Sequence, residues 1–122
     1  MLKDTLCNAI ENLIVQYQLT PYQQKKCREF FQYQKVGEFI YAGHLKSRIG
    51  VSIDVAYAML EDLKKQGYLV NLFEVYCFDC NKSKGLFLES LEQFDSDLYC
   101  DFCGKKLSLE ENIIVLYKVV HV

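Results

Sequence analysis

Apolar residues near the start of the chain recur with the period of an α-helix. Between residues 3 and 18 they follow the pattern i, i+4, i+7, i+8 and i+11, at Leu6, Ile10, Leu13, Ile14 and Tyr17. Residues spaced in this way share one helix face. The stretch TPYQ at residues 20–23 then combines a threonine N-cap, a proline at the first helical position and a glutamine three residues after the cap. Together these features predict a second helix over about residues 21–35.

The next stretch alternates between extended and helical patterns. Ser52 is a suitable N-cap, Asp54 would lie in the first turn of the helix that follows, and Gly67 is a suitable end for that helix. The predicted elements are an extended segment at 38–41, a short helix at about 43–49, a longer helix at 52–66 and a strand at 68–76.

The last ten residues are apolar at both alternations. Ile113, Val115, Tyr117 and Val119 would lie on one face of a strand, and Ile114, Leu116, Val120 and Val122 on the other. Because β-branched residues dominate, a strand is predicted. A strand that is apolar on both faces must be covered on both sides. It therefore packs between the rest of the chain's elements, or presents a face or an edge to another protein.

Four of the six cysteines form two Cys-x-x-Cys pairs. Cys77 and Cys80 make one pair, Cys100 and Cys103 the other, and 19 residues separate Cys80 from Cys100. This spacing is typical of a zinc ribbon, a small antiparallel unit held by one four-thiolate Zn²⁺. Residues that tolerate a left-handed conformation, Asn81 and Gly104, follow the two pairs directly.

Such a metal site is structural, because four thiolates leave no coordination position for water or substrate. No catalytic residues and no small-molecule substrate are therefore expected. Cys7 and Cys27 are expected to be small buried residues, and His44 and His121 have no ligand or triad partners at a suitable spacing. The alternative chemistry is a thiol oxidoreductase built on one Cys-x-x-Cys pair, although a redox dithiol more often occurs once, inside a strand-helix-strand unit.

Composition suggests a folded protein with no membrane segment. The chain has 122 residues, of which 51% are hydrophobic and 25% charged, so it should fold rather than remain disordered. No stretch has the roughly 18 apolar residues of a membrane span, and the N-terminus lacks a signal-peptide pattern. We expect a cytoplasmic α+β protein in which residues 1–76 form a helical unit and residues 77–122 form the zinc ribbon and a C-terminal β-strand.

The segment from Leu45 to Leu69 resembles a winged helix-turn-helix. It contains Ile49-Gly50-Val51-Ser52, the stripe Ala56, Leu60 and Leu63, and Gly67-Tyr68-Leu69, which match the family's packing positions. A plain helical bundle is the alternative. The resemblance implies that residues 1–76 are winged-helix-like, with the helix at 52–66 in the position of the DNA-reading helix.

A winged helix followed by a four-cysteine ribbon is similar in arrangement to the transcription factor E alpha subunit and its archaeal relative. The likeness covers about residues 20–110, although the first knuckle, Cys-Phe-Asp-Cys-Asn, departs from the Cys-Pro-x-Cys-Gly form common in such ribbons. The chain also resembles, more loosely, the small winged-helix and ribbon accessory proteins of bacterial defence systems. Both resemblances imply a non-enzymatic adaptor that binds a larger protein machine.

Charge argues against autonomous DNA binding. Residues 1–67 carry a net charge of +2 and residues 68–122 a net charge of −4, to which Zn²⁺ with four thiolates adds a further −2. Acidic surfaces repel nucleic acid. The candidate nucleic-acid face, and with it the alternative of a DNA-binding regulator, consists of Lys25, Lys26, Arg28, Lys46 and Arg48.

The surplus of apolar and aromatic residues favours a protein partner instead. Seventeen residues are Phe or Tyr, types that are enriched at interface cores. The predicted partner face combines the helix at 52–66 with the last strand, and consists of Tyr57, Glu61, Ile113, Val115, Tyr117 and Val119.

Overall fold

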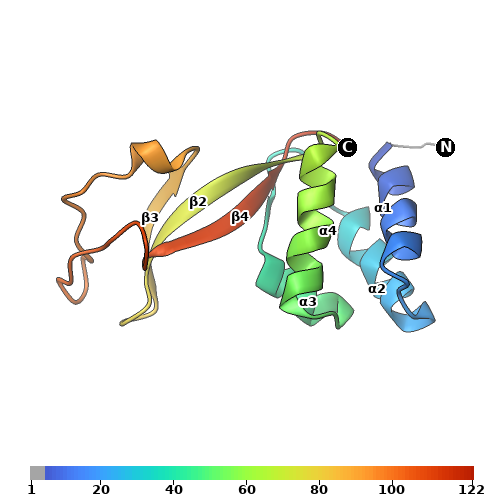
Figure 1. Cartoon of the computed structure of the whole chain (residues 1–122), viewed down its shortest axis with the longest axis horizontal. Coiled ribbons are helices and arrows are strands. Elements are labelled where there is room, and N and C mark those ends of the chain that lie inside the picture. The colour runs from blue at the N-terminus through green and yellow to red at the C-terminus, as the bar shows by residue number, and fades with distance from the viewer. Residues whose placement is uncertain (1–4) are drawn as a thin grey trace. The chain divides into compact units, whose positions relative to one another are not determined.

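The computed structural model describes residues 5–122 and has four α-helices and a four-stranded sheet (Figure 1). The strands lie in the order β1-β4-β2-β3, and the β1–β4 and β2–β3 pairs are antiparallel. The predicted α+β class is confirmed. In chain order the elements are α1 (Thr5–Gln16), α2 (Pro21–Gln32), β1 (Phe39–Ile40), α3 (Ala42–Ile49), α4 (Ile53–Lys65), β2 (Leu69–Cys77), β3 (Lys82–Leu88), the 3₁₀ turn η1 (Leu91–Gln93) and β4 (Ile113–Val119).

The chain divides into two compact units whose boundary differs from the predicted one. Unit 1 comprises the chain up to Val70 together with Tyr117–Val122, and unit 2 comprises Asn71–Leu116. The last residues belong with the helices because Tyr117 and Val119 are each only 1% exposed and pack in the helical core. Unit 2 is thus an insertion that begins within β2 and ends within β4, where the sequence predicted a C-terminal domain at 77–122.

The helix ends of unit 1 follow the predicted capping chemistry. Thr20 accepts a hydrogen bond from the backbone of Gln23, whose side chain accepts one from the backbone N–H of Thr20, so the capping box is complete. Ser52 caps α4 in the same way. However, α2 ends three residues earlier than predicted, because Gln34 donates its backbone N–H to Phe31 and its side-chain amide to Phe30. Those bonds satisfy carbonyls at the end of the helix.

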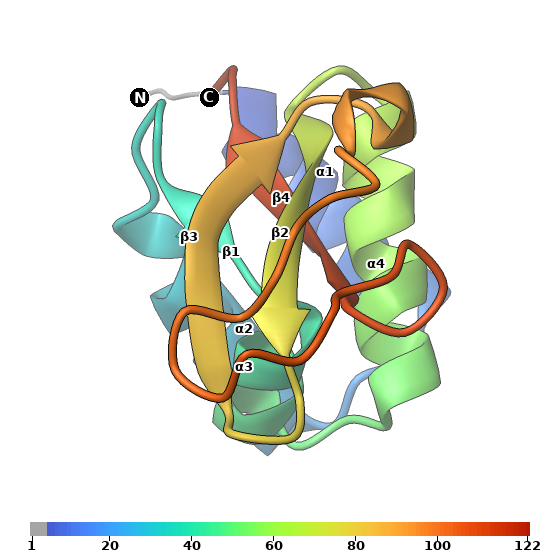
Figure 2. The same cartoon turned by 90° about the vertical axis from the view of Figure 1, so that its left-hand side faces the viewer.

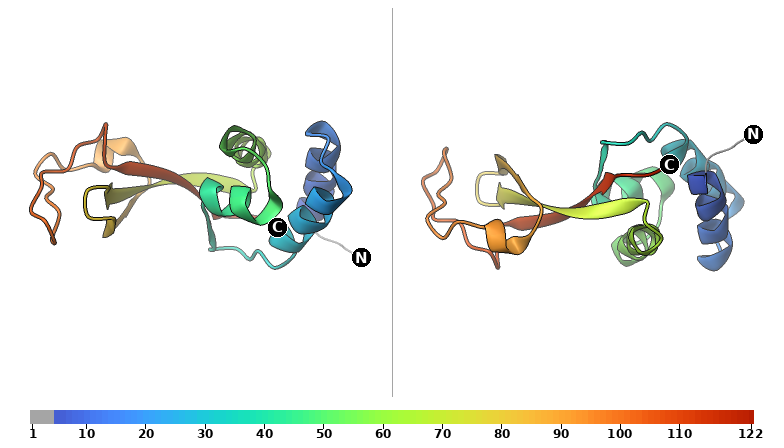
Figure 3. Two further views of the ribbon diagram at one scale, coloured as in Figure 1. Left: turned by 90° about the horizontal axis from the view of Figure 1, so that it is seen from below. Right: turned by 90° about the horizontal axis from the view of Figure 1, so that it is seen from above.

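The core of unit 1 lies between its helices. α1 packs against α2, α2 against α3, and α3 against α4 (Figure 3). The predicted stripe on α1 is buried except for the partly exposed Tyr17, and Ala56, Leu60 and Leu63 of α4 are completely buried. Burial of this extent supplies the main stabilisation of a domain.

Two carboxylates of α4 accept hydrogen bonds from tyrosines. The Tyr17 hydroxyl donates to Asp62 Oδ2 at 2.6 Å, and burial together with this carboxylate raises the pKa of Tyr17 to about 12. The Tyr117 hydroxyl donates to Glu61 Oε2. This bond, with the nearby ammonium of Lys64, lowers the pKa of Glu61. Glu61 and Asp62 therefore stabilise unit 1 internally.

Unit 2 is built on a β-hairpin. Figure 2 shows β2 and β3 side by side, with Phe73 opposite Leu88 and Cys77 opposite Lys82. The connection from β3 to β4, residues 89–112, contains η1 and the second cysteine pair.

Candidate metal centre

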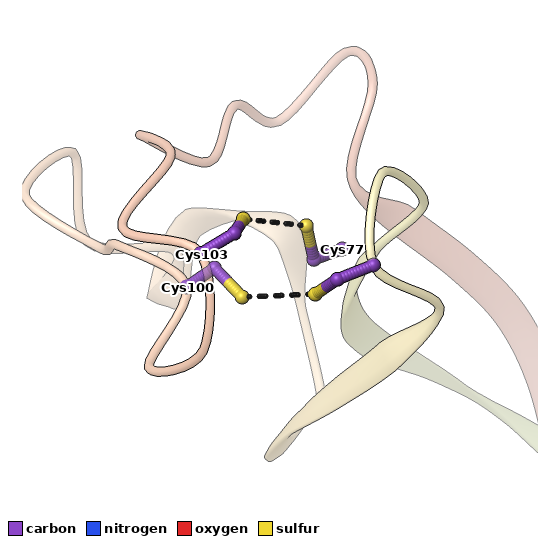
Figure 4. A group of neighbouring side chains, drawn as sticks. Cys77, Cys100 and Cys103 are labelled. Carbon is purple, nitrogen blue, oxygen red and sulfur yellow. Dashed lines mark hydrogen bonds between the residues drawn. The ribbon is translucent and has the colours of Figure 1, made fainter.

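The four paired cysteines converge in unit 2. Cys77 is the last residue of β2, Cys80 lies in the turn to β3, and Cys100 and Cys103 lie in the β3–β4 connection. Their four sulfur atoms all lie within 4.8 Å of one another, and Figure 4 shows the labelled side chains pointing toward one another across the gap between the two turns. Cys77 and Cys100 are buried, whereas Cys103 is exposed. Such a cluster can hold a metal ion.

Each knuckle is a tight turn closed by a β-type pairing. Cys77 pairs with Lys82 across the first knuckle, and Tyr99 pairs with Lys106 across the second. Just after the knuckles, Asn81 has φ 56° and Gly104 has φ 75°. These left-handed residues allow the chain to turn back, as the sequence predicted. The amide of Gly104 also donates to the carbonyl of Cys100 at 3.0 Å.

The sulfur geometry fits a tetrahedral metal and excludes disulfides. Cys77 and Cys103 Sγ are 3.7 Å apart, and Cys80 and Cys100 Sγ are 3.3 Å apart. Metal–sulfur bonds of about 2.3 Å in a tetrahedron place the sulfurs about 3.8 Å apart, whereas a disulfide needs about 2.05 Å. The backbone N–H groups of Cys103 and Phe102 lower the pKa of the Cys100 thiol to about 6. They favour the thiolate form, which is the form that binds metal.

Two ion pairs join the knuckles reciprocally. Lys84, four residues after the first knuckle, binds Asp101 inside the second at 2.7 Å. Lys105, two residues after the second knuckle, binds Asp79 inside the first at 2.9 Å. These ion pairs were not predicted from the sequence. Their signal was present, since each Cys-x-x-Cys encloses one aspartate and a lysine follows each pair closely.

Unit 2 has little apolar core apart from its cysteines. Its buried cluster consists of Val75, Leu107, Cys77 and Cys100, so half of the cluster is candidate ligands. Leu72 and Leu116 are also buried. A core this small rarely holds a domain together without a metal or disulfides.

The remaining two cysteines differ in burial, and the two histidines contact aromatic rings. Cys27 is completely buried, as predicted, and burial raises the pKa of its thiol to about 12. Cys7 was predicted to be buried, but it is exposed and lines a surface cavity of about 210 Å³ between α1 and α2. Cys7 follows Leu6 directly in α1, and this step of one residue rotates its side chain away from the buried helix face. His44 contacts the ring of Phe30, and His121 stacks on Tyr68.

The predicted basic residues lie on the neighbouring helices α2 and α3, which pack together. Arg28 is engaged by Glu11 through two hydrogen bonds of 2.7 and 2.9 Å, and Lys26 pairs with Glu29. The other three predicted cations make no ion pair with any residue in 5–122; they are Lys25, Lys46 and Arg48.

The predicted partner face is not continuous. Tyr117 and Val119 are buried, which removes them from any accessible surface. They are buried because β1 pairs with this end of β4 and the helices of unit 1 cover it. Ile113 and Val115 are half-buried in unit 2, and in unit 1 the half-buried Glu61 accepts the Tyr117 hydroxyl. Only Tyr57 is exposed.

Comparisons with protein-family models, with curated proteins and with solved structures found no match for this chain. Among the helices of the described residues, none has the length and apolar character needed to cross a membrane.

Proposed function

We propose that this chain is a non-enzymatic adaptor or accessory subunit that binds a larger protein machine, of the transcription or bacterial conflict and defence type. One structural Zn²⁺ holds its unit 2. The observation that carries the proposal is the four-cysteine cluster, because it offers a complete set of protein ligands beside exposed aromatic side chains. The reduced thiols of this cluster favour a cytoplasmic location.

Zinc is the metal that this donor set favours. Four thiolates in a tetrahedral arrangement bind Zn²⁺ or iron, whereas oxygen donors suit magnesium and calcium. All four ligands come from the chain, so no position remains for a water molecule that could attack a substrate. When bound, the ion would hold the two knuckles together, while the ion pairs Lys84–Asp101 and Lys105–Asp79 fix their orientation.

The order of elements supports the winged-helix likeness. A helix, a short strand, two helices and three further strands follow one another as α2, β1, α3, α4, β2, β3 and β4, and β4 lies between β1 and β2 in the sheet. Unit 2 occupies the place of the wing. The acids Glu61 and Asp62 on α4 make this helix unsuited to phosphate contact, which favours a protein partner.

A DNA-binding regulator is the second candidate, and one observation favours it. Lys25, Lys46 and Arg48 lie on two helices that pack together, and they are not neutralised by ion pairs within residues 5–122. Three such cations can support weak phosphate contact whose affinity falls with salt.

Two measurements test the proposal together. Native mass spectrometry of the purified chain should show one zinc per chain, and fluorescence anisotropy should show no binding to random duplex DNA at low or near-physiological salt. Micromolar binding that weakens steeply with salt, and that is lost when Lys25, Lys46 and Arg48 become Glu, would favour the DNA-binding regulator. Lys82 and Lys106, changed to Glu, provide a control in unit 2, with a charge change of four units against six for the triple variant.

A further inference from the structure

Two phenylalanines of the metal-site knuckles are exposed. Phe78, between Cys77 and Cys80, is 49% exposed, and Phe102, between Cys100 and Cys103, is 68% exposed. Phenylalanine is normally among the buried residue types. A unit with so small a core would gain stability by burying these rings, so their exposure calls for another explanation.

Contacts place both rings at the end of the β2–β3 hairpin. Phe78 lies in the hairpin turn, with its ring 4.9 Å from that of Tyr76. Lys82, opposite Cys77 in the hairpin, holds its ammonium 5.4 Å from the centre of the Phe102 ring. Aromatic rings and an ammonium therefore occur together at this end of unit 2, as they do at many binding surfaces.

The charges of unit 2 are unevenly distributed. Asn71–Leu116 contain nine acids and four lysines, a formal charge of −5. All four lysines lie within four residues of a knuckle cysteine, whereas five of the nine acids lie further away. Lys84 and Lys105 are paired with the two knuckle aspartates. Lys82 and Lys106 make no ion pair with described residues, so their ammonium groups remain available to a partner.

We propose that the knuckle surface, defined as Phe78, Lys82, Phe102 and Lys106, binds an extended acidic segment of a partner protein. Apolar side chains of the segment would pack on the two phenylalanine rings, and its carboxylates would pair with the two lysines. This inference rests on the proposed adaptor function and names the chemistry of its partner.

The number of available charges favours a peptide over a nucleic acid. Duplex DNA presents one phosphate charge per about 1.7 Å of helix axis, and its affinity comes from many lysines and arginines. The knuckle surface offers two lysines, next to a metal centre whose four thiolates leave a net charge of −2. A segment with two or three carboxylates and some apolar side chains matches this surface, whereas a polyphosphate chain does not.

Peptide titration of the zinc-loaded full chain tests the proposal. The probes are three fluorescein-labelled peptides of about ten residues, in which Leu and Phe alternate with Glu, with Gln or with Lys. We expect the Glu peptide to bind at least about tenfold more tightly than the Gln peptide. Phe102→Ala should weaken binding of the Glu peptide by about tenfold or more. Lys82→Glu should weaken it similarly and should improve binding of the Lys peptide.

Leu91→Ser is the matched control, because Leu91 is 42% exposed in the acidic connection of the same unit. Its affinity for the Glu peptide should equal that of the unmodified chain, and zinc content should be unchanged in every variant. Equal binding of all three peptides, absence of saturation below about 1 mM, or insensitivity to Phe102→Ala and Lys82→Glu would overturn the proposal. Tighter binding of single-stranded oligothymidine than of the Glu peptide would assign the surface to nucleic acid.

The failure of this inference is separable from failure of the adaptor function. A native partner that binds the zinc-loaded chain equally well after Phe102→Ala and Lys82→Glu would leave the adaptor function in place and show that the knuckle surface is not its docking site.

Discussion

Removal of the metal should unfold unit 2 and leave the helices of unit 1 folded. The perturbation is Cys100→Ser, or chelation of zinc from the unmodified chain. The two units differ sharply in how much they bury: twenty described residues form the core cluster of unit 1, whereas four form that of unit 2. Because two of those four are candidate ligands, loss of the ion would also expose cysteines packed among apolar side chains.

The magnitude follows from the buried side chains of unit 2. Leu72, Val75, Leu107 and Leu116 are its buried apolar residues other than cysteines, and each contributes about 1.5–3 kcal/mol. Together they supply about 6–12 kcal/mol. A structural zinc adds about 10–16 kcal/mol, which is comparable to the whole net stability of a typical domain, about 5–15 kcal/mol. Without the ion, unit 2 should therefore unfold.

Unit 1 should remain folded when the metal is lost, because unit 2 is one continuous segment of the chain inserted into unit 1. Unfolding of Asn71–Leu116 converts the ribbon into a flexible loop, whose closure costs on the order of 3 kcal/mol. Burial of Tyr117 and Val119 returns about 3–6 kcal/mol. The four helices should therefore persist, while the last strand becomes only marginally docked.

Limited proteolysis with mass spectrometry, alongside far-ultraviolet circular dichroism, measures both responses. Metal-free chain should be cleaved throughout residues 77–107 and should keep most of its helical signal. Cys7→Ser is the control, because Cys7 is exposed outside the metal centre, and this variant should keep both zinc and protease resistance. Unchanged protection of residues 77–107 in a chain shown to contain no metal would refute the argument.

Three further outcomes test the contacts of unit 1. Tyr17→Phe removes the hydroxyl that binds Asp62 and should lower the free energy of unfolding by about 1–2 kcal/mol, as measured by urea titration. Thr20→Ala removes one half of the capping box and should cost about 1 kcal/mol in the same assay. Because Tyr117 lowers the pKa of Glu61 below 4.5, the fold should be most stable above about pH 5 and should lose this contribution as pH falls through the folded-state pKa. Glu61→Gln should reduce the loss of unfolding free energy between about pH 5 and lower pH. If the unfolding free energy of this variant falls with pH as steeply as that of the unmodified chain, Glu61 is not responsible for the pH dependence.

The helices of unit 1 and the metal centre could be predicted because their signals are local. The stripe of α1 and the caps at Thr20 and Ser52 act within one or two helical turns. Each knuckle likewise spans four residues, and the 19 residues between Cys80 and Cys100 fall within the spacing that is typical of a four-cysteine zinc site. Asn81 and Gly104 were recognisable for the same reason, because their conformation depends mainly on the residue type.

The features that could not be predicted depend on contacts between distant segments. Both faces of β4 are apolar, so the sequence did not distinguish the covered residues Tyr117 and Val119 from residues that face a partner. The boundary of unit 2 likewise depends on the last residues, Tyr117–Val122, which pack with the helices of unit 1. The exposure of Cys7 could not be predicted, because Cys7 lies only one helical position from the buried Leu6. One position corresponds to a rotation of about 100° around the helix axis, and this rotation places the Cys7 side chain at the surface.

A metal ion held by the four cysteines would explain how unit 2 can leave its aromatic residues exposed. In an ordinary small domain, burial of rings such as Phe78 and Phe102 would contribute about 1.5–3 kcal/mol each, and a core as small as that of unit 2 would need them. A four-thiolate ion replaces several such residues at once, in a volume defined by sulfur atoms less than 5 Å apart. The rings are then free to remain at the surface of an ordered unit, where they carry little entropic cost on binding. Stabilisation by a bound ion and availability of the aromatic surface would thus both follow from the same four cysteines, and the proposed adaptor function would require both.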